Sequence, residues 1–453
     1  MSASHLLDNL QRADLLRVHG RVLRSVGPLL EASGPPAFVG EICHVHASRT
    51  EPPATAEVVG FAEGRVFLMP WSSSAGIRPG AEVVGTGNAL SVPVGRELLG
   101  RVIDGLGRPL DGKGPLRATQ HRSVRAETLN PLERVTETTP LVTGVRALDA
   151  LVTCARGQRL GLFAGGGVGK SVLMGMIART SQADVNVVAL IGERGREVMN
   201  FLENELGPEG LAKSVVVVAT SDDTPLKRVQ AARVAATVAE SFREDGLDAL
   251  LLMDSLTRVA MAQREIGLSA GEPPTTRGYP PSSFSILPEI VERAGATTRG
   301  SVTGFYTVLL EGDDVDAPLS DAARAVLDGH LMLSRELATA GHYPAIDPLE
   351  SVSRLRDDVQ DDEMLPACRE VVRLLAARRE MADLISIGAY KAGADPDVDR
   401  AVALAGPIQK FLRQGRDEAS SWDETRTGLM ELVKKRSPKV KPAATEGADV
   451  PVG

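Results

Sequence analysis

The chain has 453 residues, of which 43% are apolar and 24% charged, so it is long enough for roughly two to four soluble domains. Its net charge of −8 argues against broad nucleic-acid binding. No apolar run approaches the ~18 residues of a membrane span, and no charged-then-apolar leader opens the chain. We therefore expect a cytoplasmic protein whose association with a membrane is peripheral, with Cys43, Cys154 and Cys368 as reduced thiols.

The first 92 residues predict two units. Residues 1–19 form an imperfect amphipathic pattern typical of a short helix, which could dock a partner or pack on its own domain. Residues 20–92 change to short alternating segments separated by Gly and Pro, which predict a small β-barrel. This segment gathers no polar chemistry, so we interpret it as an assembly domain.

Residues 93–347 alternate strand-like and helical patterns. Leu98–Asp111 is turn-rich and reads as a link, and Pro115–Leu141 reads as a polar connector. The predicted strands are near-continuous apolar runs: Arg159–Ala164, Val185–Ile191, Val215–Ala219, Ala249–Met253 and Val302–Leu310. Such runs, separated by helices, predict a parallel sheet covered on both faces, with ligands at the carboxyl ends of its strands.

Strand patterns stop at about Pro348. Helical patterns over Pro366–Ile387, Asp397–Phe411 and Asp417–Lys435 predict a helical domain over residues 348–436. Residues 437–453 are rich in Pro, Ala and charge with little to bury, which predicts a disordered tail.

A glycine-rich stretch between the first predicted strand of the central domain and a helix is the clearest motif. Its glycines let backbone N–H groups converge on phosphate oxygens, and the helix that follows points its N-terminal dipole at the same charge. Ala164 stands where the strict pattern has its first Gly, and a dinucleotide fingerprint is excluded because Lys170 occupies its last glycine position. The candidate triphosphate-binding residues are Ala164, Gly165, Gly166, Gly167, Val168, Gly169, Lys170 and Ser171. Lys170 would contact the β- and γ-phosphates, and the Ser171 hydroxyl would hold Mg²⁺.

Polar residues follow two later strands. Asp254 ends an apolar strand, where its carboxylate would be a second ligand of Mg²⁺. Glu193 could orient the attacking water, and Arg194 could stabilise charge on the transferring phosphoryl group. Taken alone, an apolar strand ending in Asp is often structural, and Glu-Arg-Gly-Arg-Glu is more often a solvated turn.

Tyr343 and Arg354 lie in the stretch GHYPAIDPLESVSR. Tyr343 offers a flat face on which an adenine could stack, and Arg354 sits at the end of a serine-containing turn. A core tyrosine and a surface arginine are the alternatives, and periodicity alone does not decide between them.

Together with the phosphate loop, the stretches GERGREV, LLLMDSLTRVAMAQREIG, GEPPTTRGYPPSSFSILPEIVERAG and GHYPAIDPLESVSR resemble the type III protein-export ATPases. This family energises flagellar assembly and virulence injectisomes, and is related to the subunits of rotary ATP synthases. The resemblance runs from about Gly20 to Gln414, and GEPPTTRGYPPS is its most specific stretch.

The resemblance implies a barrel, a RecA-like core and a helical domain assembled as a homohexamer, with ATP sites between neighbours. It implies that Lys170 binds phosphate, that Ser171 and Asp254 hold Mg²⁺, and that Glu193 is the catalytic carboxylate. Arg194 would lie near the γ-phosphate and Tyr343 on the adenine. Arg354 matches an arginine finger that reaches the next subunit's nucleotide.

The same resemblance implies several partners. A coiled-coil stalk would occupy the ring's centre, faced by the loop Gly271–Pro281, and a stator-like negative regulator would bind the N-terminal region. Chaperone–substrate complexes and export-gate membrane proteins would be further partners at the inner face of the cytoplasmic membrane. No nucleic-acid partner is expected.

Two positions depart from the family. Its members usually place Asp before the proline of the stretch 313–321, where this chain has Ala317, with Asp316 shifted by one. A common glycine is replaced by Ala155. Neither is a proposed catalytic residue, so they put local loop geometry in doubt rather than hydrolysis.

Two other functions remain as alternatives. A rotary ATP synthase catalytic subunit shares most motifs, although Gly271–Pro281 and Leu384–Tyr390 favour export. An RNA-translocating hexamer would need aromatic stacking platforms and a basic track on its barrel. The candidate barrel has Phe38, Phe61, Phe67 and Trp71 but no basic run.

Overall fold

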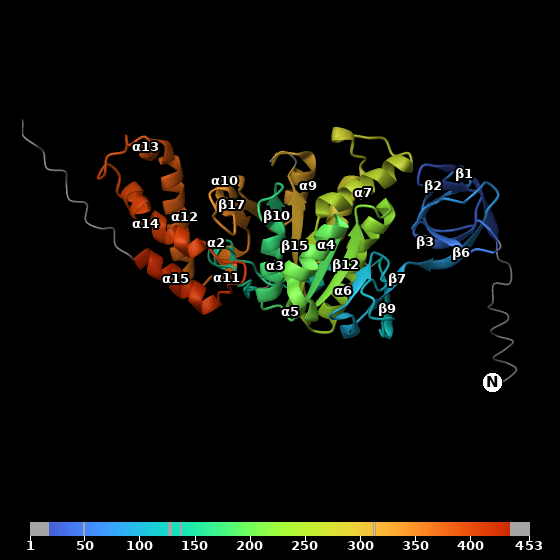
Figure 1. Ribbon diagram of the computed structural model, residues 1–453, viewed down its shortest axis with the longest axis horizontal. Coiled ribbons are helices and arrows are strands. Elements are labelled where there is room, and N and C mark those ends of the chain that lie inside the picture. Colours follow the sequence, from blue (N-terminus) through green and yellow to red (C-terminus); the bar gives the residue numbers. More distant parts are fainter. Residues whose placement is uncertain are drawn as a thin grey trace, which may run out of the picture.

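The computed structural model describes residues 18–48, 50–125, 129–135, 138–310, 312 and 314–434. Within them the chain forms a closed barrel, a central α/β domain and a C-terminal group of helices, in that order along the molecule's long axis (Figure 1). The predicted fold class is confirmed. The predicted helix over 1–19 lies outside the described residues except at 18 and 19, where a strand already begins at His19, and the predicted tail over 437–453 lies outside them entirely.

The barrel closes in the strand order β1-β2-β5-β4-β3-β6, all pairs antiparallel. Alternating apolar residues such as Leu30, Val45 and Leu68 fill its interior, which is why short alternating segments fold this way. Closure removes the exposed sheet edges. Its strands are β1 (His19–Val26), β2 (Leu29–Ala32), β3 (Glu41–His46), β4 (Ala54–Ala62), β5 (Arg65–Pro70) and β6 (Glu82–Ala89).

The central sheet has the order β17-β16-β10-β15-β13-β11-β12-β8, with the short β14 pairing β15. Neighbours from β16 to β8 are parallel, and β17 and β14 are antiparallel to their partners. Its strands are β8 (Val102–Asp104), β10 (Arg159–Ala164), β11 (Val185–Glu193), β12 (Ser214–Thr220), β13 (Asp248–Asp254), β14 (Gly295–Ala296), β15 (Ser301–Leu309), β16 (Gly329–Leu333) and β17 (Ile346–Ser353). A separate pair joins β7 (Ser91–Val94) to β9 (Gln120–Ser123).

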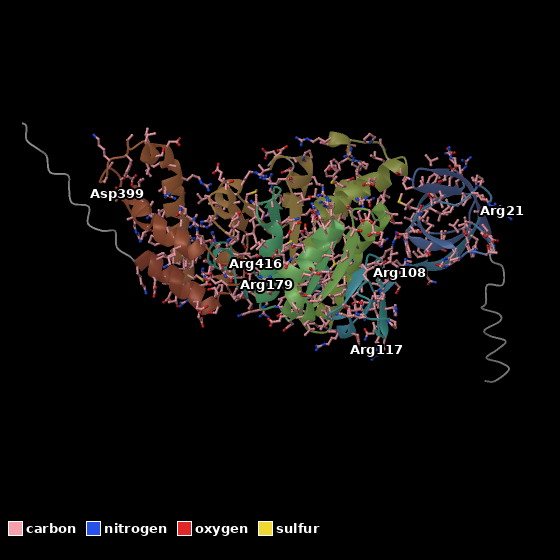
Figure 2. The ribbon with its side chains drawn as sticks, viewed as in Figure 1. Arg21, Arg108, Arg117, Arg179, Asp399 and Arg416 are labelled. Carbon is pink, nitrogen blue, oxygen red and sulfur yellow. The ribbon has the colours of Figure 1, made fainter. Side chains whose placement is uncertain are left out.

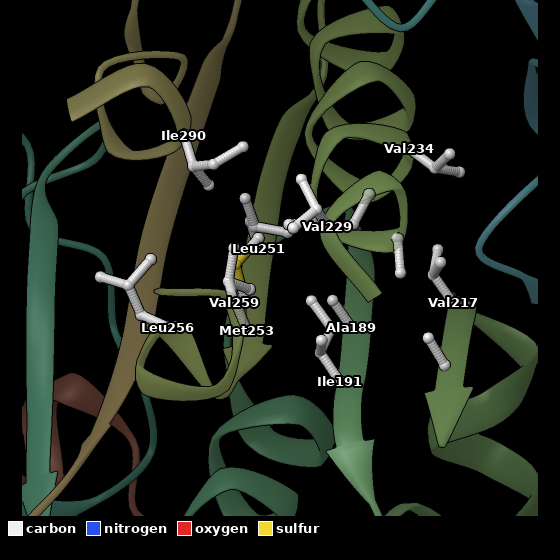
Figure 3. Packing of buried hydrophobic residues seen from close by; sticks show 14 of the residues in the cluster. Ala189, Ile191, Val217, Val229, Val234, Leu251, Met253, Leu256, Val259 and Ile290 are labelled. Carbon is white, nitrogen blue, oxygen red and sulfur yellow. The ribbon is translucent and has the colours of Figure 1, made fainter. Parts of the chain in front are cut away.

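Helices cover both faces of the sheet, as continuous apolar strands require. On one face, Ala189 and Ile191 of β11 and Leu251 and Met253 of β13 pack with Val229 and other apolar residues of the covering helices (Figure 3). The intervening residues, including Val188 and Leu190, point to the other core. The covering helices are α2 (Arg146–Leu151), α3 (Lys170–Thr180), α4 (Gly195–Asn200), α5 (Gly207–Ala212), α6 (Pro225–Glu244), α7 (Leu256–Ser269), α8 (Ser282–Val291), α9 (Pro318–Val326) and α10 (Arg335–Thr339).

Two predicted boundaries are wrong. Leu98–Asp111 is not only a link, because β8 within it pairs with β12 at the edge of the sheet. Strands do not stop at Pro348 either, because β17 runs on to Ser353. Proline and polar residues hid β17 from the pattern, but an edge strand tolerates both, since one of its sides needs no partner.

The C-terminal domain contains α11 (Arg356–Val359), α12 (Met364–Glu380), α13 (Ala382–Ser386), α14 (Pro396–Leu412) and α15 (Trp422–Lys434). The single helix predicted over Pro366–Ile387 is interrupted at Met381. Side chains from the central domain hold this unit: Arg179 of α3 donates to the Arg416 carbonyl at 2.6 Å, and both labels lie together at the junction in Figure 2. Among the described residues no helix has the length and apolarity needed to cross a bilayer.

Ala155 and Ala317, the two positions that depart from the family pattern, both fit the local backbone. Ala155 is buried and is not among the residues with positive φ, which in the described part of the chain include only Glu63 and Arg277 besides glycines. Alanine therefore fits where a glycine is common. Ala317 occupies the N-cap of α9 and its side chain caps nothing.

Candidate active site

The phosphate loop lies between β10 and α3. Gly167 has φ +78° and Gly169 φ +92°, conformations that a Cβ would strain, and Gly169 is the N-cap of α3. Four loop glycines, with Lys170 and Ser171, line a cavity of about 440 Å³. Ala164 and Val168 are buried instead, so they support the loop from behind, while Gly165, Gly166, Gly167 and Gly169 face the cavity.

Parallel strand ends bring the predicted acids to this cavity. Lys170 forms an ion pair with Asp254 of β13, and its Nζ lies 3.8 Å from Glu193 Oε1 at the end of β11. Thr307 of β15 donates to Asp254 Oδ1 at 2.7 Å. Three strands and the first residue of α3 therefore converge on one point, as the carboxyl-end rule predicts.

The oxygen donors at this point suit Mg²⁺. Asp254 is 3% exposed, and the Ser171 hydroxyl makes no hydrogen bond to any described residue, so it is available to a metal. Hydroxyl and carboxylate oxygens are hard ligands, and Mg²⁺ commonly binds one or two protein groups together with phosphate oxygens. No group of three or more His, Cys, Asp or Glu side chains in the described ranges could hold a metal without such help.

Glu193 is electrostatically unusual. Burial, the nearby Asp254 charge and a hydrogen bond with Glu197 raise the pKa of Glu193 to about 7, while Lys170 and Arg258 oppose that shift. The same hydrogen bond lowers the pKa of Glu197. A carboxyl with such a pKa, held beside a phosphate loop, is suited to orienting water or exchanging a proton.

The structure does not bring Arg194 into this group. Its side chain is 67% exposed and its closest acidic partner is Glu197, at 3.9 Å. Besides Lys170, the cation beside Glu193 is Arg258, whose Nε lies 3.4 Å from Glu193 Oε1 and whose side chain lines the cavity. Gly192 makes room for it, because a Cβ there would lie 2.6 Å from Arg258 Cδ. Sequence reasoning missed Arg258, although its place four residues after Asp254, in the first turn of α7, was a usable signal.

Tyr343 lines a second cavity of about 390 Å³ that shares Gly167, Gly169 and Val172 with the first. Tyr343 is 46% exposed, and its ring carbons lie 3.5 Å from where a Gly169 Cβ would stand. Leu173 and Met176 add apolar surface to this cavity. A flat, partly exposed aromatic ring above the phosphate loop is suited to stacking on a base. Gln414 and Arg416 of the C-terminal domain close the far side, which sequence reasoning did not anticipate.

Arg354 lies away from these cavities. Strand β17 is antiparallel to β16, so Ile346 is level with the phosphate-loop end of β10, and Ser353 is at the opposite end of the sheet. The Arg354 N–H bonds the Asp328 carbonyl there, level with Arg159. Five residues of β10 separate that level from the loop, about 17 Å, and strand β16 lies between β17 and β10. Its side chain is exposed and has no ion-pair partner among the described residues.

Family models match most of the described chain. Residues 22–87 match the ATP synthase alpha/beta family beta-barrel domain, and residues 144–353 match its nucleotide-binding domain. Residues 360–431 match the T3SS EscN ATPase C-terminal domain. The "Flagellum-specific ATP synthase" of Treponema pallidum is 52% identical over 424 residues, covering 94% of this chain and 95% of its own.

The chain belongs to the type III protein-export ATPases. The "Type 3 secretion system ATPase" of Sinorhizobium fredii is 49% identical, with 93% of this chain and 94% of that one covered. Among solved structures, the assembled ATPase EscN from enteropathogenic E. coli superposes on this export ATPase with a TM-score of 0.87. It is 43% identical and covers 91% of this chain and 100% of its own. A second structure, EscN with its central stalk EscO, gives a TM-score of 0.84 at 43% identity, again covering 91% and 100%. The relatives are ATPases that serve protein export, so this chain is an enzyme of that class, and the rotary ATP synthase alternative is not favoured.

Proposed function

We propose that this export ATPase binds Mg-ATP in the two joined cavities and hydrolyses it when a second copy supplies Arg354. Lys170 binds the phosphates, Glu193 orients the attacking water, and Tyr343 stacks on the adenine. Ser171 and Asp254 would hold Mg²⁺, which neutralises phosphate charge and favours attack. The observation that carries the proposal is the meeting of Lys170, Glu193 and Asp254 at one edge of the sheet.

Arg258 and Arg194 take different places in this proposal. Arg258 holds the Glu193 carboxylate and lines the phosphate cavity, so it is the better placed cation for the transferring group. Arg194 lies outside, and a role near the γ-phosphate would require its exposed side chain to turn inward.

In this proposal the active enzyme is a homohexamer. The site of one chain holds no arginine finger of its own, since Arg354 lies at the opposite end of the sheet from the phosphate loop. EscN, the structural relative, is described as assembled and as bound to a central stalk. By analogy, the Gly271–Pro281 loop would face a coiled-coil stalk in the ring, and the N-terminal region would bind a stator-like regulator.

The ring would release and unfold export substrates from chaperones at the inner face of the cytoplasmic membrane, next to export-gate proteins. Family membership supports this role, and the site itself supports only the hydrolysis that drives it.

The test of the proposed reaction is phosphate release from ATP by the purified chain at increasing Mg²⁺. Lys170→Ala should abolish turnover at every Mg²⁺ concentration, while Lys391→Ala, an exposed lysine outside both cavities, should match the wild type. Equal turnover by Lys170→Ala and the wild type would contradict the proposal.

A further inference from the structure

A third cavity, of about 490 Å³, lies between the central domain and the C-terminal helices. Leu337 of α10 and Ile346 of β17 line one side, and Leu375 of α12 and Ile408 of α14 line the other; these elements are neighbours in Figure 1. The cavity shares no residue with the phosphate or adenine cavities. Its volume falls in the range of small-molecule sites, which are mostly apolar with a few placed polar groups.

One of its polar groups is a buried imidazole without a partner. His342 is 5% exposed and lines the cavity, yet its ring makes no hydrogen bond to any described residue. Burial and the charge of Arg413 lower the pKa of His342, so the ring is neutral near pH 7. The ring nitrogens are not among the described side-chain atoms that are enclosed without a partner, so they open into the cavity, where they can bond to a polar atom of a ligand.

The charges around the cavity leave one cation available. Arg379 donates to both carboxylate oxygens of Asp347, at 2.8 and 2.7 Å, and to the Glu350 carboxylate at 3.0 Å. Arg378, the neighbouring guanidinium, lines the cavity and has no ion-pair or hydrogen-bond partner in the described ranges. The only carboxylate in the lining is thus paired with Arg379, which leaves Arg378 as the lining cation that no described carboxylate binds.

We propose that this cavity is a second ligand site that binds a small organic anion with an apolar body. The apolar part would lie among the Leu and Ile side chains, and the anionic group would face Arg378. The His342 ring would supply a hydrogen bond to a polar atom of the ligand. Charge complementarity favours this occupant over an uncharged one.

The position of His342 couples this site to the nucleotide. His342 lines the third cavity, and the next residue, Tyr343, lines the adenine cavity, so one short segment separates the two. That segment is held by bonds from the His342 N–H to the Leu337 carbonyl and from the Gln414 N–H to the Tyr343 carbonyl, both 2.9 Å. A ligand that shifts His342 therefore shifts Tyr343. This coupling rests on the proposed function, and it must be reciprocal.

The anion site is tested by titrating the full chain, without nucleotide, with 1-anilinonaphthalene-8-sulfonate and following its fluorescence, then displacing it with decanoate. Ala382→Phe adds a ring at the cavity wall and should weaken the anion's binding at least about tenfold. Arg378→Gln, an exposed substitution that leaves the core untouched, should weaken it roughly three- to tenfold. Lys391→Gln removes the same charge from the loop between α13 and α14, outside the cavity, and should leave binding unchanged.

The coupling is tested by measuring the Kd of a fluorescent ADP analogue with and without saturating decanoate. We expect a change of about fivefold or more, matched by an equal change in anion affinity at saturating nucleotide. If the wild type shows no saturable anion binding, the proposed site is wrong. If both Ala382→Phe and Arg378→Gln bind the anion as tightly as the wild type, the proposed site is also wrong. An unchanged nucleotide Kd contradicts the coupling alone. Because anion binding is measured without ATP, its failure is distinct from a failure of hydrolysis.

Discussion

At the scale of single residues, the site depends on where acidic and basic groups are held relative to Glu193. Burial and the Asp254 charge raise the pKa of Glu193, whereas Lys170 and Arg258 favour its ionised form. Bound triphosphate would add negative charge near Glu193, and Mg²⁺ would add positive charge. The surroundings thus control the protonation of Glu193 strongly, which fits a catalytic carboxylate.

Glu193→Gln should retain nucleotide binding and lose turnover, because an amide keeps the shape of the side chain but cannot act as a base. Binding of a fluorescent nucleotide and steady-state phosphate release measure the two properties separately. Normal steady-state hydrolysis by this variant would remove Glu193 as the catalytic carboxylate.

Arg258→Ala should lower kcat roughly 10²-fold, because it removes a cation that contacts Glu193 inside the phosphate cavity. Arg194→Ala is the matched control and should cost much less, since that side chain is exposed. If the loss caused by Arg194→Ala is larger, Arg194 turns inward in the working enzyme and our placement of the two arginines is wrong.

At the scale of single elements, caps and edge contacts explain how the strands and helices around the site are held. Ser255 caps α7 directly after Asp254, with its Oγ accepting from the Arg258 N–H at 3.2 Å, so the Asp254 carboxylate and the helix start are fixed together. At the far edge, Asp111 binds Arg101 and the Val102 N–H, which holds β8 against the sheet.

Ala317→Asp should stabilise the protein by about 1 kcal/mol, because an Asp at an N-cap accepts a hydrogen bond from the first turn of the helix and Ala cannot. The midpoint of chemical denaturation, compared with wild type, measures the effect. Ala317→Val, which offers no acceptor, should not stabilise α9, and equal stabilisation by both substitutions would contradict the capping argument.

Asp111→Asn should lower Tm at pH 7, and the difference from wild type should shrink as the pH falls below about 4. The Arg101 guanidinium holds the pKa of Asp111 below its ordinary value. A carboxyl whose pKa is lowered by folding stabilises the fold at pH values above its ordinary pKa of 3.8. This stabilisation is lost as the pH falls through the lowered pKa of the folded state. Thermal unfolding of both proteins between pH 7 and pH 3 measures the difference in Tm. A difference that stays constant across that range would contradict the predicted pH dependence.

The parts of the fold and site that the sequence predicts are those carried by local pattern. The apolar strands, the phosphate loop and the acids at strand ends need only periodicity and spacing, and Lys170, Glu193 and Asp254 do meet. The sequence does not predict strand β17, or Gln414 at the side of the adenine cavity, because their placement depends on contacts between distant segments. The inward cation was assigned to Arg194 rather than Arg258 because only packing around Gly192 separates the two.

At the scale of the whole molecule, the phosphate loop and Arg354, the proposed arginine finger, cannot meet within a single chain. The phosphate loop lies at one end of β10 and Arg354 at the level of the other. Arg354 is exposed and has no ion-pair partner in the described ranges, so its guanidinium is free to reach a nucleotide bound by a neighbouring chain. We therefore expect activity to rise cooperatively with protein concentration as rings form, measured as specific activity against dilution. Constant specific activity where the monomer dominates would oppose this.

The most direct test of sharing between subunits mixes two inactive variants. Arg354→Ala should reduce turnover roughly 10³-fold, as removal of other arginine fingers does, and Lys170→Ala should abolish it. In a mixed ring, an interface where the first variant supplies Lys170 and the second supplies Arg354 is complete. The account predicts that ATP hydrolysis by the mixture exceeds that of either variant alone. A mixture shown to co-assemble that is no more active than the single variants would contradict it.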